Sequence, residues 1–198
     1  MRATIVDYGA GNLRSVQNTL EELDVPHVVT NDPEVVSRAE KLILPGVGHF
    51  GQMMQALDHL GLCNILVEQI RSGVSFLGIC VGLQCLFESS EESPGANGLG
   101  ILPGQVKRFN GPLRVPHMGW NSLDQIKSST LLKGLNGEVF TYFAHSYYAP
   151  VVEATAVTCT YIQPYSAVIE QGNLYAVQFH PEKSGPAGLR VLKNFIEL

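Results

Sequence analysis

Cys80 stands between two glycines in the apolar run FLGICVGLQCLF, residues 76–87. The spacing Gly78-Ile-Cys-Val-Gly82 matches a nucleophile elbow, with cysteine in place of the usual serine. In such an elbow a sharp turn lifts the nucleophile above a sheet. Its neighbours two residues before and two residues after approach so closely that glycine is needed to avoid a clash. The alternative is a buried core thiol between two packing glycines, and the motif alone leaves both interpretations open.

A cysteine nucleophile needs a base, and the base needs an orienting group. His180 has the most suitable setting, because LYAVQFHPEKS reads as an apolar strand that ends in His-Pro-Glu. Pro181 favours extended backbone at His180, and in an extended stretch residues 180 and 182 project to the same side. Glu182 is therefore predicted to bind the imidazole while the other ring nitrogen faces Cys80. The alternative is a strand-end histidine beside a surface glutamate. Surface or structural roles are predicted for His27, His49, His59 and His117.

The first half of the chain must position this cysteine, and it alternates strand-like with helix-like segments. The apolar strand-like segments are residues 3–8, 27–30, 41–46 and 74–79. Apolar residues at helical spacing predict helices over residues 13–23, 50–60, 63–70 and 81–90. The last helix would point its N-terminus at Cys80 and favour the thiolate through its dipole. This alternation predicts an α/β fold whose mostly parallel central sheet has helices on both faces.

After about Gly95 the pattern changes to strand-like runs separated by Gly, Pro and Asn turns. These runs are residues 97–109, 115–123, 139–149, 154–161 and 165–180. Gln171-Gly172-Asn173 lies between two alternating stretches and predicts a hairpin. The last segment, residues 185–198, predicts a helix with Leu189, Leu192 and Phe195 on one stripe. We therefore expect one domain over residues 1–198 with an antiparallel-rich second half.

The composition limits the class of protein. The chain has 198 residues, of which 45% are hydrophobic and 16% charged, so a globular domain with a substantial core is expected. A net charge of −5 without a dense Lys/Arg cluster argues against a nucleic-acid binder. The longest uncharged apolar runs, Ser72 to Phe87 and Ala154 to Ile169, are too short for a membrane helix. The N-terminal segment does not resemble a signal peptide, and a cytoplasmic protein is expected.

The cysteines do not form a metal-binding pattern. Their spacing contains no C-x-x-C pair and no zinc motif, so they are expected to be thiols in a reducing compartment. Cys85 lies five residues after Cys80 and is predicted to be a core residue. The four cysteines are Cys63, Cys80, Cys85 and Cys159.

The order Cys, His, Glu, with the last two separated by one proline, resembles the class I (triad) glutamine amidotransferases. The resemblance spans Asp7 to Ser184 and is carried by VDYGAGNLRSV, LPGVGHFG, GICVGLQCLF, MGWN, YFAHSYYA and QFHPEKS. It implies a flavodoxin-like fold that needs neither a cofactor nor a metal. It also implies that Cys80 attacks the side-chain amide of glutamine, forms a thioester and releases ammonia, with His180 as base and acid and Glu182 as its orienting group.

The resemblance assigns further site residues. The oxyanion would be met by backbone amides of Val81 and of the PGVG loop, residues 45–48, which includes Val47 and Gly48. Glutamine would be recognised by Gln84, one helical turn after Cys80, for which the alternative is a polar residue on a solvated helix face. The backbone around HSY would also contribute, namely His145, Ser146 and Tyr147.

DYGAGN, PGVG and MGWN are similar to a branch of the family that docks on a (β/α)8 cyclase subunit as a heterodimer. Ammonia then passes through the barrel instead of escaping into water. Trp120, the only tryptophan, could equally be a core residue. The interface residues that the resemblance implies are Asn12, Met118, Trp120, Tyr142 and Lys183.

Two other classes of function remain open at this point. One is a related triad amidotransferase or a self-contained cysteine hydrolase acting on a γ-glutamyl or peptide substrate. It would not need a partner, and the hydrolase would not explain DYGAGN and MGWN. The other is a non-enzymatic thiol sensor, which would have no use for His180 and Glu182.

Overall fold

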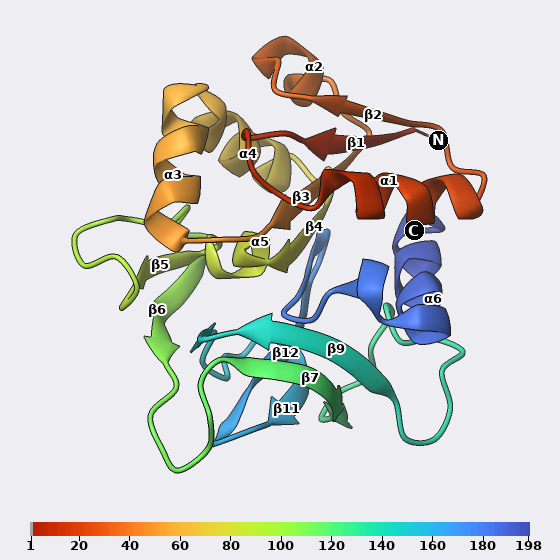
Figure 1. The fold of residues 1–198 in the computed structure, drawn as a ribbon. Helices are drawn as coiled ribbons and strands as arrows, with labels where there is room; N and C mark the ends of the chain where they lie inside the picture. Colours follow the sequence, from red (N-terminus) through yellow and green to blue (C-terminus); the bar gives the residue numbers. More distant parts are fainter. Residues whose placement is uncertain (1) are drawn as a thin grey trace.

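The computed structural model describes residues 2–198, apart from the side chain of Gln125. Its centre is an eight-stranded sheet in the order β2-β1-β3-β4-β13-β12-β11-β8, drawn in Figure 1. The first five strands in this order pair in parallel, and the remaining pairings are antiparallel. The strands are β1 (Ala3–Val6), β2 (His27–Thr30), β3 (Lys41–Gly46), β4 (Ser75–Cys80), β8 (Asp124–Gln125), β11 (Thr155–Thr160), β12 (Pro164–Gln171) and β13 (Leu174–Val177).

Two smaller sheets lie beside the central one. The first contains β10 (Tyr147–Tyr148), β6 (Leu102–Arg108) and β5 (Phe87–Ser90). The second is an antiparallel pair of β7 (His117–Ser122) and β9 (Phe140–His145). The predicted change to antiparallel strands in the second half, including the β12–β13 hairpin, is confirmed.

Helices cover the parallel strands on two sides (Figure 1). On one side α1 contacts α6, and on the other α4 contacts α2 and α3. Apolar residues at helical spacing explain why α1 and α6 form and pack as they do. Helix α1 buries Val16 and Leu20, and α6 buries Val191, Leu192 and Phe195. No helix in residues 2–198 is both long enough and apolar enough to cross a membrane. The helices are α1 (Leu13–Glu22), α2 (Pro33–Ser37), α3 (Phe50–His59), α4 (Leu62–Arg71), α5 (Val81–Gln84), α6 (Gly185–Ile196) and the 3-10 helix η1 (Pro181–Lys183).

The predicted stripe on the last helix needs one correction. Leu192 and Phe195 are buried, but Leu189 is only half-buried. Gly188 takes the buried position next to it, where an added Cβ would lie 1.9 Å from the carbonyl oxygen of Pro181. The helix therefore meets η1 through a glycine and not through a leucine.

The predicted helix over residues 81–90 is wrong in its second half. Only Val81–Gln84 is helical, and Phe87–Ser90 forms β5, which pairs in parallel with β6. The carbonyl groups of Cys85 and Leu86 accept hydrogen bonds from the amides of Leu99 and Ile101, far along the chain, and not from a following helical turn. A non-local pairing thus replaces the local helix. Two smaller departures are that α2 was not predicted and that Pro45 and Gly46 belong to β3, not to a turn.

The register of the parallel strands brings three chain segments to one edge of the sheet. Gly46 at the end of β3 lies opposite Cys80 at the end of β4, and Val177 at the end of β13 lies opposite Ile79. The loop after β3, the elbow after β4 and the residues after β13 therefore meet at the carboxyl ends of the strands. Ligand sites of open α/β sheets occupy this edge.

Candidate active site

Cys80 lies at a strained turn between β4 and α5. Its backbone has φ 55° and ψ −108°, a left-handed conformation that is rare for a residue with a side chain. A Cβ added to Gly78 would lie 2.6 Å from the carbonyl oxygen of Gly82, and one added to Gly82 would lie 2.1 Å from the carbonyl oxygen of Leu44. Both glycines are thus required by close backbone approach, as the elbow motif predicts.

Gly82→Ala is expected to destabilise the fold. The new methyl group would overlap the Leu44 carbonyl oxygen, and relieving such overpacking costs about 1–3 kcal/mol or more of the free energy of unfolding. Urea unfolding of the purified chain measures the loss. Gly172→Asn is the matched control, because Gly172 has φ +61° with nothing within 4 Å of an added Cβ and asparagine tolerates that conformation. A Gly82→Ala midpoint equal to that of the parent chain would refute the packing argument.

His180 and Glu182 form a buried pair beside the elbow. The Nδ1 atom of His180 lies 2.9 Å from Oε1 of Glu182, and the two side chains are only 4% and 2% exposed. The predicted contact and the extended backbone at His180 are confirmed, but Pro181–Lys183 forms η1 and not the predicted extended stretch. This 3-10 turn brings Glu182 back onto the imidazole. The His180 amide donates to the Tyr142 carbonyl oxygen at 2.9 Å, and the Ser184 hydroxyl donates to the His180 carbonyl oxygen at 2.7 Å.

The charge state of His180 depends on its two partners. Burial by itself would lower its pKa, whereas hydrogen bonds to Cys80 and Glu182, reinforced by their charges, raise the pKa to about 10. At neutral pH the imidazole therefore holds a proton between a sulfur and a carboxylate. The structure brings Cys80, His180 and Glu182 together in the order required for nucleophile, base and orienting group.

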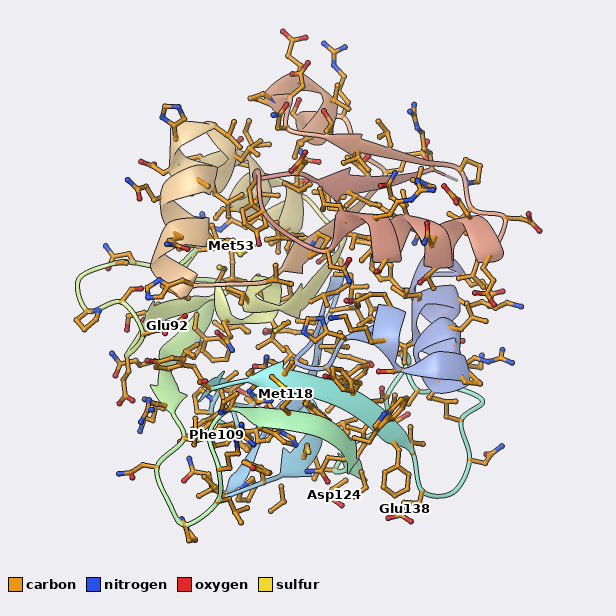
Figure 2. All side chains as sticks on the ribbon, in the orientation of Figure 1. Met53, Glu92, Phe109, Met118, Asp124 and Glu138 are labelled. Atoms are coloured by element: carbon orange, nitrogen blue, oxygen red, sulfur yellow. The ribbon has the colours of Figure 1, made fainter. Side chains whose placement is uncertain are left out.

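A cavity of about 230 Å³ opens in front of this triad. Its wall includes Cys80 and His180, with Glu182 behind the imidazole. The cavity also collects every residue for which an oxyanion or substrate role was predicted: Val47, Gly48, Val81, Gln84, His145, Ser146 and Tyr147. The remaining lining residues are Ala144, Lys183 and Glu92, and Figure 2 marks Glu92 beyond the end of β5.

Glu92 was missed by the sequence analysis. One of its carboxylate oxygens accepts a hydrogen bond from the Phe50 amide at 2.7 Å, which holds the start of α3 against the cavity wall. Nothing in the local sequence indicates this position, because the preceding residues were predicted to be helical. It arises only from the reversal of the chain at β5.

Gln84 is buried, and its predicted alternative as a solvated helix-face residue is excluded. Its Nε2 atom donates to the Tyr147 carbonyl oxygen at 2.8 Å and to Oε1 of Gln178 at 3.1 Å. Gln178 in turn directs its Nε2 atom at the Cys80 sulfur, 3.6 Å away. Gln178 was also missed, although a polar residue within the apolar run LYAVQF was an available signal.

The PGVG loop has an unexpected internal contact. The Val47 amide donates to the Tyr8 hydroxyl at 3.1 Å, and this hydroxyl lies at the same distance from the Val47 carbonyl oxygen, to which it donates. Burial raises the pKa of Tyr8 to about 12, so the hydroxyl keeps its proton. Val47 therefore lines the cavity, but its amide is engaged by Tyr8 and is not free to meet an oxyanion. Gly48, with φ +91°, has the left-handed backbone that favours glycine.

The residues implied as a partner interface lie mostly on β7, β9 and η1. Met118 is 65% exposed and Trp120 57% exposed, so the tryptophan is not a core residue; Figure 2 marks Met118 on β7. The Trp120 ring packs edge-on against the Tyr142 ring. The Lys183 Nζ atom lies over the same Tyr142 ring, 6.0 Å from its centroid. Asn12 lies apart from this group, at the start of α1.

A family model described as glutamine amidotransferase class-I matches residues 4–198. The chain belongs to this family. Among class-I glutamine amidotransferases, the imidazole glycerol phosphate synthase subunit HisH of Methanothermobacter thermautotrophicus is 48% identical over 195 residues, covering 98% of this chain and 97% of that protein. The subunit of the same name from Deinococcus radiodurans is 48% identical, with 96% of this chain and 91% of that protein covered.

Solved structures agree with the predicted class-I glutamine amidotransferase fold. A crystal structure described as a glutamine amidotransferase has a TM-score of 0.77 at 21% identity, covering 98% of this chain and 97% of that one. The structure of PurLQS from Thermotoga maritima has a TM-score of 0.73 at 17% identity, covering 99% of this chain and 97% of that one. At these identities the likeness concerns the fold, and it confirms the predicted α/β architecture.

Proposed function

We propose that this chain is the glutaminase subunit of an imidazole glycerol phosphate synthase, a single cytoplasmic domain over residues 1–198. It hydrolyses glutamine to glutamate and ammonia and passes the ammonia to a cyclase subunit. That subunit forms imidazole glycerol phosphate and AICAR in histidine biosynthesis. The observation that carries the proposal is that the elbow cysteine and a buried His180–Glu182 pair meet at one cavity. Relatives at 44–48% identity over nearly the whole chain support the choice of subunit.

The triad carries the reaction in two steps. The Cys80 sulfur attacks the side-chain amide carbon of glutamine, forming a C–S bond, and the negative charge that develops on the oxygen meets the Val81 amide. His180 gives its proton to the nitrogen as the C–N bond breaks, and ammonia leaves behind a thioester. Water then adds to the thioester with His180 as base, the C–S bond breaks, and glutamate is released. Glu182 keeps the imidazole oriented throughout.

The cavity suits free glutamine better than a peptide. A volume of about 230 Å³ is enough for a single small amino acid. The Glu92 carboxylate supplies an acceptor for the α-ammonium group. Because both hydrogens of the Gln84 amide are used within the protein, its Oε1 atom remains as an acceptor for the substrate. These features favour a glutaminase over a γ-glutamyl or peptide hydrolase.

The partner docks on the exposed part of β7 and β9. Trp120 lies opposite Tyr142 in the strand register and Met118 lies opposite Ala144, a residue of the cavity wall. A protein seated on Met118 and Trp120 therefore lies beside the strand that contributes Ala144 to the cavity wall. A (β/α)8 cyclase in this place receives ammonia before water protonates it.

The function is tested by glutamate release from glutamine. We expect the isolated chain to turn over slowly and to accelerate by roughly 5- to 150-fold with the cyclase subunit and its nucleotide ligand, the range of ordinary coupling between sites. The reason is that the Val47 amide is bound to Tyr8 in the chain alone. Equal turnover with and without the partner would contradict the coupling. Faster cleavage of γ-glutamyl peptides than of glutamine would favour the hydrolase instead.

Trp120→Ala is expected to weaken partner binding by at least about 2 kcal/mol, roughly 30-fold, because large exposed aromatic side chains dominate such interfaces. Isothermal titration of the cyclase subunit measures the affinity. Val35→Ala is the matched control, since Val35 is an exposed apolar residue on α2, away from β7. Unchanged affinity of the Trp120 variant would move the interface elsewhere.

A further inference from the structure

We propose that Gln178 is a positioning residue for the nucleophile. Its side-chain amide donates a hydrogen bond to the Cys80 sulfur, and the direction of that bond is imposed by the Tyr147 carbonyl group through Gln84. The role in glutamine hydrolysis rests on the function proposed above, but the hydrogen bond itself can be tested without glutamine.

The direction of the chain of hydrogen bonds follows from its first member. A backbone carbonyl oxygen can only accept, so Gln84 must present its NH2 group to Tyr147, at 2.8 Å. The same NH2 group faces Gln178 at 3.1 Å, and Gln178 must therefore present its oxygen there. This leaves the Gln178 NH2 group pointing at the Cys80 sulfur, 3.6 Å away. Reversing Gln84 would place its oxygen against the Tyr147 carbonyl oxygen, and reversing Gln178 would place two NH2 groups face to face.

Burial prevents the chain from relaxing into water. Gln178 is 0% exposed, Gln84 2% and Cys80 3%. The Gln178 backbone amide is held by the Ala167 carbonyl oxygen at 2.9 Å, and the β13–β4 register pairs Val177 with Ile79, so the next residues, Gln178 and Cys80, are neighbours. A misdirected buried amide would lose its partners at a cost comparable to a full hydrogen bond. The donor is thus fixed towards the sulfur.

The Gln178 NH2 group interacts with the Cys80 sulfur more directly than the short helix α5 can. The sequence predicted that a long helix after Cys80 favours the thiolate, but α5 has only four residues and its dipole is correspondingly small. The Gln178 NH2 group instead meets the sulfur from the side of β13, while His180 meets it from the segment after that strand. Gln178 and His180 thus both act on the sulfur from the segment that follows β13.

Three other titratable groups that interact with the sulfur do not supply a charge at neutral pH. Tyr8, Cys85 and Tyr165 all lie close enough to interact with Cys80. Burial raises the pKa of each of the three, that of Tyr8 to about 12, so they remain uncharged. The acidic and basic side chains that line the same cavity are His180, Glu92 and Lys183, with Glu182 behind His180, and Gln178 is the neutral donor to the nucleophile.

The test is the pH dependence of Cys80 alkylation by iodoacetamide in the full chain, followed by mass spectrometry of the peptide that contains Cys80. Gln178→Met keeps the approximate length of the side chain and removes the donor. We expect its half-maximal alkylation to move about one unit to higher pH, and its alkylation rate at pH 7 to fall about tenfold. Gln178→Glu places an acceptor against the sulfur and should shift the profile further in the same direction.

Two further variants separate this effect from loss of stability. Gln84→Met removes the group that sets the direction, so a smaller shift of the same sign is expected, and this variant serves also if Gln178→Met does not fold. Asn194→Leu removes another buried amide, which donates to the Leu131 and Lys133 carbonyl oxygens away from the cavity. It should lower stability without moving the alkylation profile.

A parent-like alkylation profile in the Gln178 variants would overturn the proposal. An equal shift in Asn194→Leu would overturn it too, because the effect would then be general destabilisation. If the profile shifts as expected in a chain that never hydrolyses glutamine, the hydrogen bond stands and the proposed function fails. If glutamine is hydrolysed but the alkylation profile of the Gln178 variants does not shift, the proposed function stands and the positioning role of Gln178 fails.

Discussion

Cys80→Ser is expected to remove glutamine hydrolysis almost completely, by a factor on the order of 10⁴ or more, because loss of a covalent nucleophile removes the pathway through the thioester. A serine hydroxyl is a much weaker nucleophile than a cysteine sulfur and cannot replace it beside His180. Binding of the cyclase subunit should be unchanged, since Cys80 is buried in the cavity wall and does not belong to the exposed surface around Trp120. Synthesis of imidazole glycerol phosphate from added ammonia should also continue.

The measurements are glutamate release and ammonia-dependent synthesis by the same reconstituted complex. Cys63→Ser is the matched control, because Cys63 is a half-buried thiol on α4 that does not line the cavity. It should hydrolyse glutamine at the parent rate. Glutamine turnover in the Cys80→Ser complex near the parent rate would remove Cys80 from the role of nucleophile. Loss of both activities would indicate a damaged complex and leave the two roles unseparated, so partner affinity is measured alongside.

Glu182→Gln is expected to lower glutamine hydrolysis by roughly 10²- to 10⁴-fold, the effect of changing the orienting group of a catalytic histidine. The amide keeps the approximate shape of the side chain but removes its charge. Because the Glu182 hydrogen bond and charge are among the influences that raise the pKa of His180 to about 10, the pKa should fall in the variant. Steady-state turnover in the complex measures the loss, and an unaltered rate would contradict the role of Glu182.

The same variant has a defined effect on the pH dependence of stability. The folded-state pKa of His180, about 10, lies above the ordinary value of 6.5, so protonated His180 stabilises the folded chain. That contribution is fully present below about pH 6.5 and is lost as the pH rises through about 10. The difference in free energy of unfolding between the parent chain and Glu182→Gln should therefore be largest near pH 6 and shrink towards pH 10.

Urea unfolding at several pH values measures this difference. Glu197→Gln is the control, since Glu197 forms an exposed pair with Lys193 at 3.7 Å and such pairs contribute little. Its difference from the parent chain should not change with pH. A Glu182→Gln difference that grows as the pH rises would show that His180 is not held as a cation in the folded chain.

Much of the fold could be predicted from local patterns. The buried strands 41–46 and 74–79 and the amphipathic helices near residues 13, 50 and 63 have periodicities set by their own residues, and the structure places β3, β4, α1, α3 and α4 there. The helix predicted over residues 81–90 was wrong in its second half, because Phe87–Ser90 pairs with β6 and does not continue the helix. Local periodicity cannot register a hydrogen-bond partner that lies far along the chain.

The sequence by itself determined which residues could form the triad. Glycines at 78 and 82 are needed by the turn around Cys80, and Glu182 is two residues from His180, so these relations are local. Their chemistry could be proposed from residue type and spacing alone. The mutual approach of the two motifs, 100 residues apart by number, depended on the parallel sheet that the alternating pattern predicts.

Only the tertiary structure decided what surrounds the triad. The β13–β4 register places Gln178 beside Cys80, and the reversal of the chain after β5 brings Glu92 to the cavity. The loop after β1 approaches the loop after β3, so that the Tyr8 hydroxyl accepts a hydrogen bond from the Val47 amide. Each contact depends on strand order and register, which no short motif encodes. The physical reason is that polar atoms in a buried site take the partners that chain topology brings within reach, and that topology is set by packing over the whole chain.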